Sequence, residues 1–366
     1  MARPEYSVIV PIWNRLELIT HYFHELQSAL DLNRHEVIVA FDGGVSPAVK
    51  RYVEGLRPQI PTMTLVETER QLGYAATANR AVTAASGDIL VFTDSDVFPV
   101  AGAVELLAGF VAAHDDVGAA QGLLLYPQSL TVQSAGHLIF DFWNFHAYEH
   151  SAATRGVIRQ PADRQALSTA FLAVRRELFS PHGGFDTFYF NGWEGMELTV
   201  KIRMSGYRCV FFPEACGYHV RGSARGRQPQ QKNPQETGYF WSKWGGKLKN
   251  DLASTLEQQL TAADRARPYI LIDGSFAPRF RHIAAEIGLR TDDEIRIADW
   301  TGGPVMLQNN VPYHLLASSH DLLFMVNSIV DIAGNALVID ARREQHDLVL
   351  DLHGNAVLLR ELATHQ

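Results

Sequence analysis

Residues 89–99 read ILVFTDSDVFP, an apolar run that ends in two carboxylates. The first four residues are typical of a buried strand, since β-branched and aromatic side chains favour strands. Asp94 and Asp96 follow, two positions apart. In an extended chain such residues project to the same side, and two neighbouring carboxylates are costly to bury unless a cation neutralises them. The stretch therefore predicts either a site for a hard divalent ion, shared with a diphosphate, or a solvated acidic turn.

Strand and helix patterns alternate around this stretch. The predicted strands lie at 6–12, 36–41, 62–67 and 88–93, and the predicted helices at 16–30, 47–56 and 75–85. Such alternation builds βαβ units, and hence an α/β fold with a mostly parallel sheet and helices on both faces. Ligands bind such sheets at the carboxyl ends of the strands, where Asp94 and Asp96 are expected.

The length of 366 residues predicts two domains. After Trp244 the pattern changes, first to a polar helical stretch and then to short apolar runs separated by turns. We predict a main domain over 1–247, a helical connector over 248–267, and a smaller α/β or strand-rich accessory domain of unknown role over 268–366.

Composition narrows the class of protein. The net charge of −8 argues against a nucleic-acid partner, which would need a basic face. No stretch approaches the roughly 18 to 20 apolar residues of a membrane span, so we expect no transmembrane segment. The start MARPEYSVIVP lacks a signal-peptide pattern, and Cys209 and Cys216 have no CxxC spacing. We expect a cytoplasmic protein, with peripheral contact to a membrane left open.

Five segments together resemble family 2 glycosyltransferases with the GT-A fold. In chain order they are SVIVPIWNR, EVIVAFDGG, RQLGYAATANRA, SGDILVFTDSD and the run from WEGMEL to GYRCVFFPEACGYH, over residues 6–219. The resemblance implies a Rossmann-like sheet and a carbohydrate-biosynthesis enzyme that moves a hexosyl or related sugar from a UDP, GDP or TDP sugar. The acceptor stays open between a carbohydrate, a lipid-linked molecule, a peptide and a small molecule, as does a homodimer. The glycine-rich N-terminal loop of a sugar nucleotidyltransferase is absent.

The resemblance assigns the donor nucleotide to residues at strand ends and helix starts. They are Pro11, Ile12, Asn14, Asp42, Gly73, Asn79, Asp94, Ser95 and Trp193. Phe41 departs from the family, which usually has an acidic or amide residue there, so uridine recognition does not follow. Taken alone, Asp42 is equally an ordinary turn residue and Gly73 an ordinary glycine before a helix. For Asn79, on a helix otherwise rich in alanine, a ligand contact is favoured.

The acidic pair matches the metal motif of the family. The resemblance makes Asp94 and Asp96 ligands of Mn²⁺ or Mg²⁺, with Asp94 also meeting the nucleotide and His219 as a third ligand. An isolated histidine would more often be structural. The ion would neutralise the diphosphate as it leaves.

Glu194 and Glu197 open a predicted helix and match the acceptor and general-base region of the family. Without the resemblance they would simply favour the helix dipole, with Glu197 paired to Lys201. The family usually has a second acid where this chain has Gly195. We therefore expect Glu194 to be the base of an inverting reaction, with Glu197 as the second candidate. A retaining enzyme, or a catalytically weak relative that binds carbohydrate or serves as a scaffold, stays open.

Overall fold

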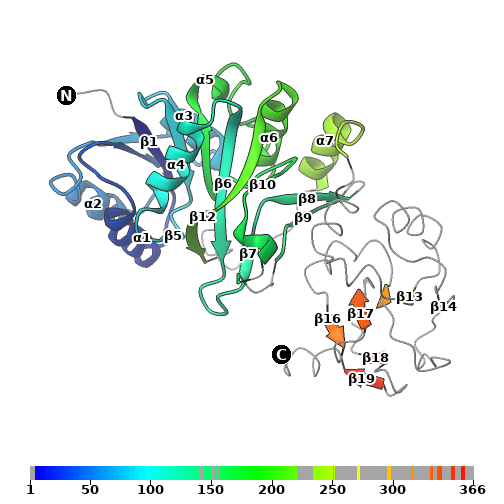
Figure 1. Cartoon of the computed structure of the whole chain (residues 1–366). Helices are drawn as coiled ribbons and strands as arrows, with labels where there is room; N and C mark the ends of the chain where they lie inside the picture. Colours follow the sequence, from blue (N-terminus) through cyan, green and yellow to red (C-terminus); the bar gives the residue numbers. More distant parts are fainter. Residues whose placement is uncertain are drawn as a thin grey trace. The chain divides into compact units, whose positions relative to one another are not determined.

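The computed structural model describes residues 5–140, 143–149, 153–154, 156–220, 234–249 and 251, and short strands between 270 and 358 (Figure 1). Contacts divide the chain into two units. The first comprises Met1–His137 with His146–Leu248, and the second comprises Leu138–Phe145 with Lys249–Gln366.

A ten-stranded sheet forms the centre of the first unit, in the order β10-β12-β6-β11-β4-β1-β2-β3, with β5 beside β12 and β7 beside β6. Its strands are β1 (Tyr6–Ile12), β2 (Glu36–Phe41), β3 (Met63–Glu67), β4 (Ile89–Thr93), β5 (Val97–Pro99), β6 (Val117–Leu125), β7 (Val132–Ser134), β10 (Ala162–Asp163), β11 (Phe171–Arg175) and β12 (Arg208–His219). The strands β3, β2, β1 and β4 are parallel, as predicted. The strand β11 lies antiparallel between β4 and β6, which the sequence pattern did not predict.

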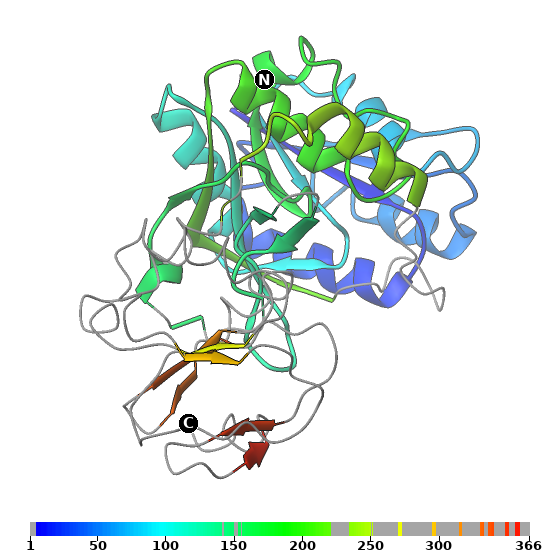
Figure 2. The same cartoon turned by 90° about the vertical axis from the view of Figure 1, so that its right-hand side faces the viewer.

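Helices cover both faces of this sheet. They are α1 (Leu16–Ala29), α2 (Pro47–Gly55), α3 (Tyr74–Val82), α4 (Ala103–Ala113), α5 (Arg176–Phe179), α6 (Glu194–Met204) and α7 (Pro234–Trp244), with a 3₁₀ turn η1 (Gly156–Arg159). In Figure 2 the dark blue α1 and the green α6 lie on opposite sides of the strands. The predicted α/β fold is confirmed.

The alternation of side chains along the strands creates two cores. In β1, Val8 and Val10 point into the core under α1, α2 and α4, whereas Ile9 points into the core under α3 and α6. All three side chains are fully buried, as expected for a strand covered on both faces. Because the strands are parallel, the carboxyl ends of β2, β1 and β4 come to one edge of the sheet.

The second unit contains short strands. A five-stranded sheet has the order β14-β13-β15-β17-β16, and β8 pairs with β9 and β18 with β19. The strands are β8 (His137–Phe140), β9 (Trp143–His146), β13 (Ile270–Ile272), β14 (Ile295–Ile297), β15 (Leu315–Leu316), β16 (Val330–Ile332), β17 (Ala336–Ile339), β18 (Leu348–Leu350) and β19 (Ala356–Leu358).

The connector predicted over 248–267 lies mostly outside the described residues, so its helical character and the domain boundaries stay predictions. Among the helices that the structure describes, none has the length and apolar character needed to cross a bilayer.

Candidate active site

The two aspartates lie in a tight turn at the carboxyl end of β4. The Val97 N–H donates to the Asp94 carbonyl oxygen at 3.0 Å, which closes the turn, and the Asp94 N–H donates to the Ala170 carbonyl oxygen at 3.1 Å. The extended conformation from which we predicted that both carboxylates share one side is therefore wrong. The turn, and the strands on either side of it, bring Asp94 and Asp96 together.

His219 reaches this turn through strand pairing. Because β5 is antiparallel to the end of β12, Val97 lies opposite His219. The Val220 N–H donates to the Asp96 carbonyl oxygen at 3.0 Å, and the Gln133 side-chain amide of β7 donates to the His219 carbonyl oxygen at 3.0 Å. The imidazole Nε2 of His219 then lies 3.4 Å from Asp96 Oδ1.

These three side chains form a cluster that fits a divalent cation. One ligand atom from each of Asp94, Asp96 and His219 lies within 4.8 Å of the other two. Asp96 is buried, and Asp94 and His219 are partly exposed, so the cluster has one open side. Two carboxylates and an imidazole are a donor set for Mn²⁺ or a similar ion, and their paired negative charge is costly to bury without one.

Glu194 lies at the start of α6 and is connected to this cluster through residues 169–170. Its side chain is 3% exposed. Its Oε2 accepts the Gly192 N–H at 2.6 Å and its Oε1 accepts the Thr169 hydroxyl at 3.3 Å. Thr169 precedes Ala170, whose carbonyl oxygen holds Asp94. Residues 169–170 therefore connect Glu194 to the cluster of Asp94, Asp96 and His219.

Gly195 has a steric reason to be glycine. A Cβ atom at this position would lie 2.5 Å from Thr169 Cγ2 and 2.9 Å from the Thr169 backbone nitrogen. Any side chain would therefore displace Thr169, and the second acid that is usual in the family does not fit here. Thr169 therefore accounts for the glycine at position 195, where the family usually has an acid. Glu194 remains as the carboxylate that Thr169 connects to the cluster.

Glu197 has a different environment. It is fully buried, and its Oε2 accepts the Tyr189 hydroxyl at 2.5 Å. Its Oε1 lies 3.0 Å from Lys201 Nζ, which confirms the predicted pair, and also contacts Lys243 of α7. Lys243 further binds Asp186 Oδ2 at 3.2 Å. These contacts make Glu197 an anchor between α6 and α7, and its catalytic role stays a prediction.

Asp42 binds the residues that lead into the helix α3. Its Oδ1 accepts the Leu72 N–H at 2.7 Å and the Thr77 hydroxyl at 3.0 Å, and its Oδ2 accepts the Gly73 N–H at 3.1 Å. A carboxylate near a helix N-terminus also favours the positive end of the helix dipole. Asp42 therefore joins the end of β2 to the start of α3. Its contact with the donor nucleotide stays a prediction.

Gly73 and Asn79 build the wall of the site through contacts within the protein. Gly73 has φ +84°, and a Cβ atom there would lie 2.2 Å from the Phe190 carbonyl oxygen. Asn79 Nδ2 donates to the Phe185 carbonyl oxygen at 2.7 Å, and the Phe185 N–H donates to Asn79 Oδ1 at 3.0 Å. The amide of Asn79 thus holds the loop at Phe185, and its contact with a ligand stays a prediction.

The remaining predicted residues lie at the same edge of the sheet or at the start of α6. Pro11 and Ile12 end β1, and Asn14 Oδ1 accepts the Ser46 N–H at 3.1 Å. Ser95 is in the acidic turn and is partly buried. Trp193 packs on Phe240 of α7, with ring centroids 4.7 Å apart.

Sequence reasoning missed two residues of this region, Thr169 and Tyr74. Thr169 lies in a segment without a motif, and its place is set by the antiparallel pairing of β11 with β4. Tyr74 is the first residue of α3 and has a buried hydroxyl. Its position directly after Gly73, at a predicted helix start, is the one signal that the sequence contains.

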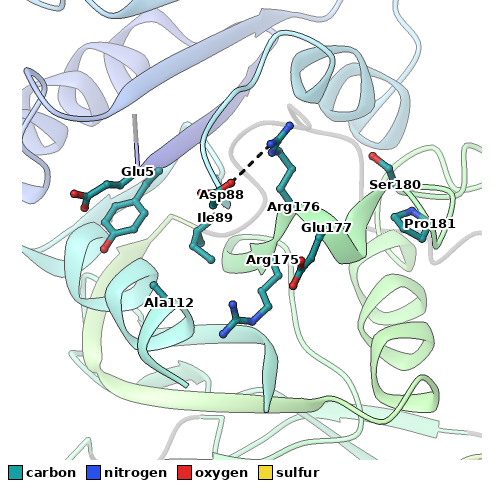
Figure 3. Close-up of a pocket in the computed structure, with 10 residues that line it drawn as sticks. Glu5, Asp88, Ile89, Ala112, Arg175, Arg176, Glu177, Ser180 and Pro181 are labelled. Atoms are coloured by element: carbon teal, nitrogen blue, oxygen red, sulfur yellow. Dashed lines mark ion pairs between the residues drawn. The ribbon is translucent and has the colours of Figure 1, made fainter. Parts of the chain in front are cut away.

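A cavity of about 850 Å³ lies at the opposite edge of the sheet, where β1 and β4 begin (Figure 3). Figure 3 shows Arg176 and Asp88 facing each other, and their charged atoms are 3.8 Å apart. Arg175 donates to the carbonyl oxygens of Val111, His114 and Val117. The arginines are thus engaged with the protein, and the cavity is separate from the candidate active site.

Comparison with known proteins agrees with this geometry. Residues 7–181 match the model of glycosyl transferase family 2. The chain is 26% identical over 212 residues to the N-acetylglucosaminyl-diphospho-decaprenol L-rhamnosyltransferase of Mycobacterium tuberculosis, over 51% of this chain and 66% of that protein. It is 25% identical over 232 residues to the O-antigen biosynthesis protein RfbC of Myxococcus xanthus, over 61% of this chain and 18% of that protein. The chain thus spans less than two thirds of the length of these relatives.

The fold is similar to that of GalNAc-T7, whose crystal structure contains UDP, GalNAc and Mn²⁺. The TM-score is 0.53 at 16% identity, over 79% of this chain and 55% of that chain. At this identity the similarity concerns the fold alone, and it places the chain in the GT-A architecture.

Proposed function

We propose that this chain, whose residues 7–181 belong to glycosyltransferase family 2, transfers a sugar from a nucleoside-diphosphate sugar to an acceptor nucleophile in a reaction that needs a divalent metal. One observation carries the proposal: the ligand atoms of Asp94, Asp96 and His219 lie within 4.8 Å of one another. They do so at the carboxyl end of β4, where α/β sheets bind ligands.

Asp94, Asp96 and His219 would hold the cation, and Mn²⁺ suits the set because imidazole nitrogen is a better ligand for transition metals than for Mg²⁺. When bound, the cation supplies Lewis-acid chemistry, by neutralising the charge that develops on the leaving diphosphate. The buried Asp96 is held on both sides, since its carbonyl oxygen accepts the Val220 N–H and its carboxylate lies beside His219. This rigidity would hold a bound diphosphate in a fixed position relative to Glu194.

Glu194 would act as the general base. An acceptor hydroxyl attacks the anomeric carbon, the new C–O bond forms as the bond to the diphosphate breaks, and the hydroxyl proton passes to Glu194. The Gly192 N–H and the Thr169 hydroxyl hold its two carboxylate oxygens in place. A single displacement of this kind inverts the anomeric configuration, so we propose an inverting reaction.

The nucleotide would lie along the carboxyl ends of β1, β2 and β4. The residues proposed to line it are Pro11, Ile12, Asn14, Asp42 and Ser95. Phe41 ends β2 where the family usually has a polar residue, and it is 3% exposed. Because a phenyl ring accepts no hydrogen bond from a base N–H, we do not assign the base. The activity of the mycobacterial relative supports a lipid-linked molecule as one acceptor class.

Titration calorimetry with UDP, GDP and TDP, in Mn²⁺ and in EDTA, tests this proposal. We expect one nucleotide to bind in Mn²⁺, and expect the Asp96→Ala variant to lose this binding while its unfolding profile in EDTA stays nearly unchanged. Binding that survives both EDTA and the substitution would exclude the metal centre. Metal-dependent binding without turnover of any UDP, GDP or TDP sugar would favour the alternative, a catalytically weak relative that binds carbohydrate or serves as a scaffold.

A further inference from the structure

Residues 169–170 form a short junction between the metal cluster and α6. The Ala170 carbonyl oxygen accepts the Asp94 N–H at 3.1 Å, and the Thr169 hydroxyl donates to Glu194 Oε1 at 3.3 Å. Gly195 packs directly on Thr169, with no space for a side chain between them. Pairing of β11 with β4 sets this junction, so its position follows from the core of the sheet.

Tyr74 approaches the same junction from α3. Its N–H donates to the Phe190 carbonyl oxygen at 2.9 Å, and its ring lies 5.9 Å from the ring of Phe185. Gly73, immediately before it, also packs on Phe190. The backbone of Tyr74 is therefore fastened to the loop that leads into Glu194.

The Tyr74 hydroxyl is buried, and among the described residues it completes no hydrogen bond. Burial raises the pKa of Tyr74 well above its ordinary value, the charges of Asp94 and Glu194 raise it further, and the nearby Thr169 lowers it. The hydroxyl is thus neutral, and the groups that shift its pKa, besides burial, include Asp94, Glu194 and Thr169. Phenylalanine would fill the same space without burying an unsatisfied hydroxyl, so packing alone does not account for it.

We propose that Tyr74 is a positioning residue for the general base, with its hydroxyl donating to Thr169 while the Thr169 hydroxyl donates to Glu194. This inference rests on the proposed function and adds a residue to it. A donated hydrogen bond favours the ionised, oriented carboxylate that must accept the proton of the acceptor. The contact of Gly73 and Tyr74 with Phe190 keeps the three side chains in one place.

The test measures release of nucleoside diphosphate from UDP, GDP and TDP sugars in Mn²⁺, together with melting temperature. For Tyr74→Phe we expect kcat to fall about 3- to 10-fold, the value of one hydrogen bond between neutral groups, with the donor KM unchanged. The melting temperature should change little, because phenylalanine fills the same space and only one hydrogen bond between neutral groups is lost. A purely structural hydroxyl would give the reverse, a lower melting temperature with unchanged kcat.

Tyr22→Phe is the matched control. The Tyr22 hydroxyl is also buried without a hydrogen bond among the described residues and feels the charge of Asp94, but it projects from α1, on the other face of the sheet. We expect kcat of this variant within about twofold of wild type. A Tyr22→Phe loss as large as that of Tyr74→Phe would contradict the proposed route.

Thr169 lies between Tyr74 and Glu194 in the proposed chain of hydrogen bonds, and its substitution tests that chain. Thr169→Val should lower kcat as Tyr74→Phe does, whereas Thr169→Ser, which keeps the hydroxyl, should keep the wild-type kcat. In a Glu194→Gln background, Tyr74→Phe should lower kcat no further. A further loss of kcat from Tyr74→Phe in that background, or an unchanged kcat for Tyr74→Phe in the wild-type background, would overturn the role of Tyr74. Either result would leave the proposed function standing. A wild-type protein that releases no nucleoside diphosphate would instead overturn the proposed function, and this inference with it.

Discussion

Replacing the two glutamates of α6 one at a time should separate catalysis from stability. In Glu194→Gln, the amide oxygen can still accept the Gly192 N–H, and the amide nitrogen can donate to the Thr169 hydroxyl. The fold should therefore be unchanged, but no base remains. We expect kcat to fall about 10²- to 10⁴-fold, the usual contribution of a positioned base, with donor binding and melting temperature unchanged.

Glu197→Gln should have the opposite effect. One oxygen of Glu197 accepts the Tyr189 hydroxyl and the other meets Lys201 and Lys243, whose side chains are 23% and 30% exposed. The amide nitrogen can still donate to the Tyr189 hydroxyl, but an amide has no charge to pair with Lys201 and Lys243, and a hydrogen bond to a charged group contributes about 1.5–3 kcal/mol. Because both lysines keep some solvent, we expect the unfolding free energy to fall by about 2–3 kcal/mol, which lowers the melting temperature by roughly 4–12 °C.

Release of nucleoside diphosphate in Mn²⁺ and scanning calorimetry measure the two effects on the same samples. Full activity of Glu194→Gln across the pH range would remove Glu194 as the base and favour a retaining or non-catalytic protein. A Glu197→Gln variant with normal melting temperature and a rate as low as that of Glu194→Gln would show that the two assignments are reversed.

Three further predictions concern stability and domain structure. Removal of residues 268–366 should leave a soluble protein that binds nucleotide in Mn²⁺; an insoluble product would show that the C-terminal part completes a shared core. Gly195→Ala should lower the unfolding free energy by about 1–3 kcal/mol in a denaturant titration, because its Cβ would lie 2.5 Å from Thr169 Cγ2. The pKa of Asp186 is lowered because hydrogen bonds, among them those from Phe188 and Lys243, outweigh the effect of burial, so its contribution to stability is complete above its ordinary pKa of 3.8 and is lost as the pH falls through the lower folded-state value. The stability of Asp186→Asn should accordingly depend less on pH below about 4 than that of wild type, and equal acid sensitivity of the two proteins would contradict this sign.

The strands β1, β2, β3 and β4 were predicted to within one residue or so of their bounds, as was α1. Their signals are local, since apolar periodicity and turn residues are read within one segment. The antiparallel β11 was missed because strand direction depends on the path of the chain between β4 and β6. Glu197 shows the same limit within a helix: its pairing with Lys201 follows from helical spacing, whereas its contact with Lys243 joins two helices.

The sequence by itself therefore determined an α/β sheet with Asp94 and Asp96 at the carboxyl end of a buried strand, and the likeness to a family added His219 and Glu194. Only the tertiary structure decided that Asp42, Gly73 and Asn79 are held by contacts within the protein and that Gly195 must be glycine. It also decided that residues 169–170 join the metal cluster to Glu194. The physical reason is range: hydrophobic periodicity acts between neighbours in the chain, whereas a hydrogen bond or a steric limit acts between atoms a few ångströms apart, wherever the packing of the sheet and helices brings them.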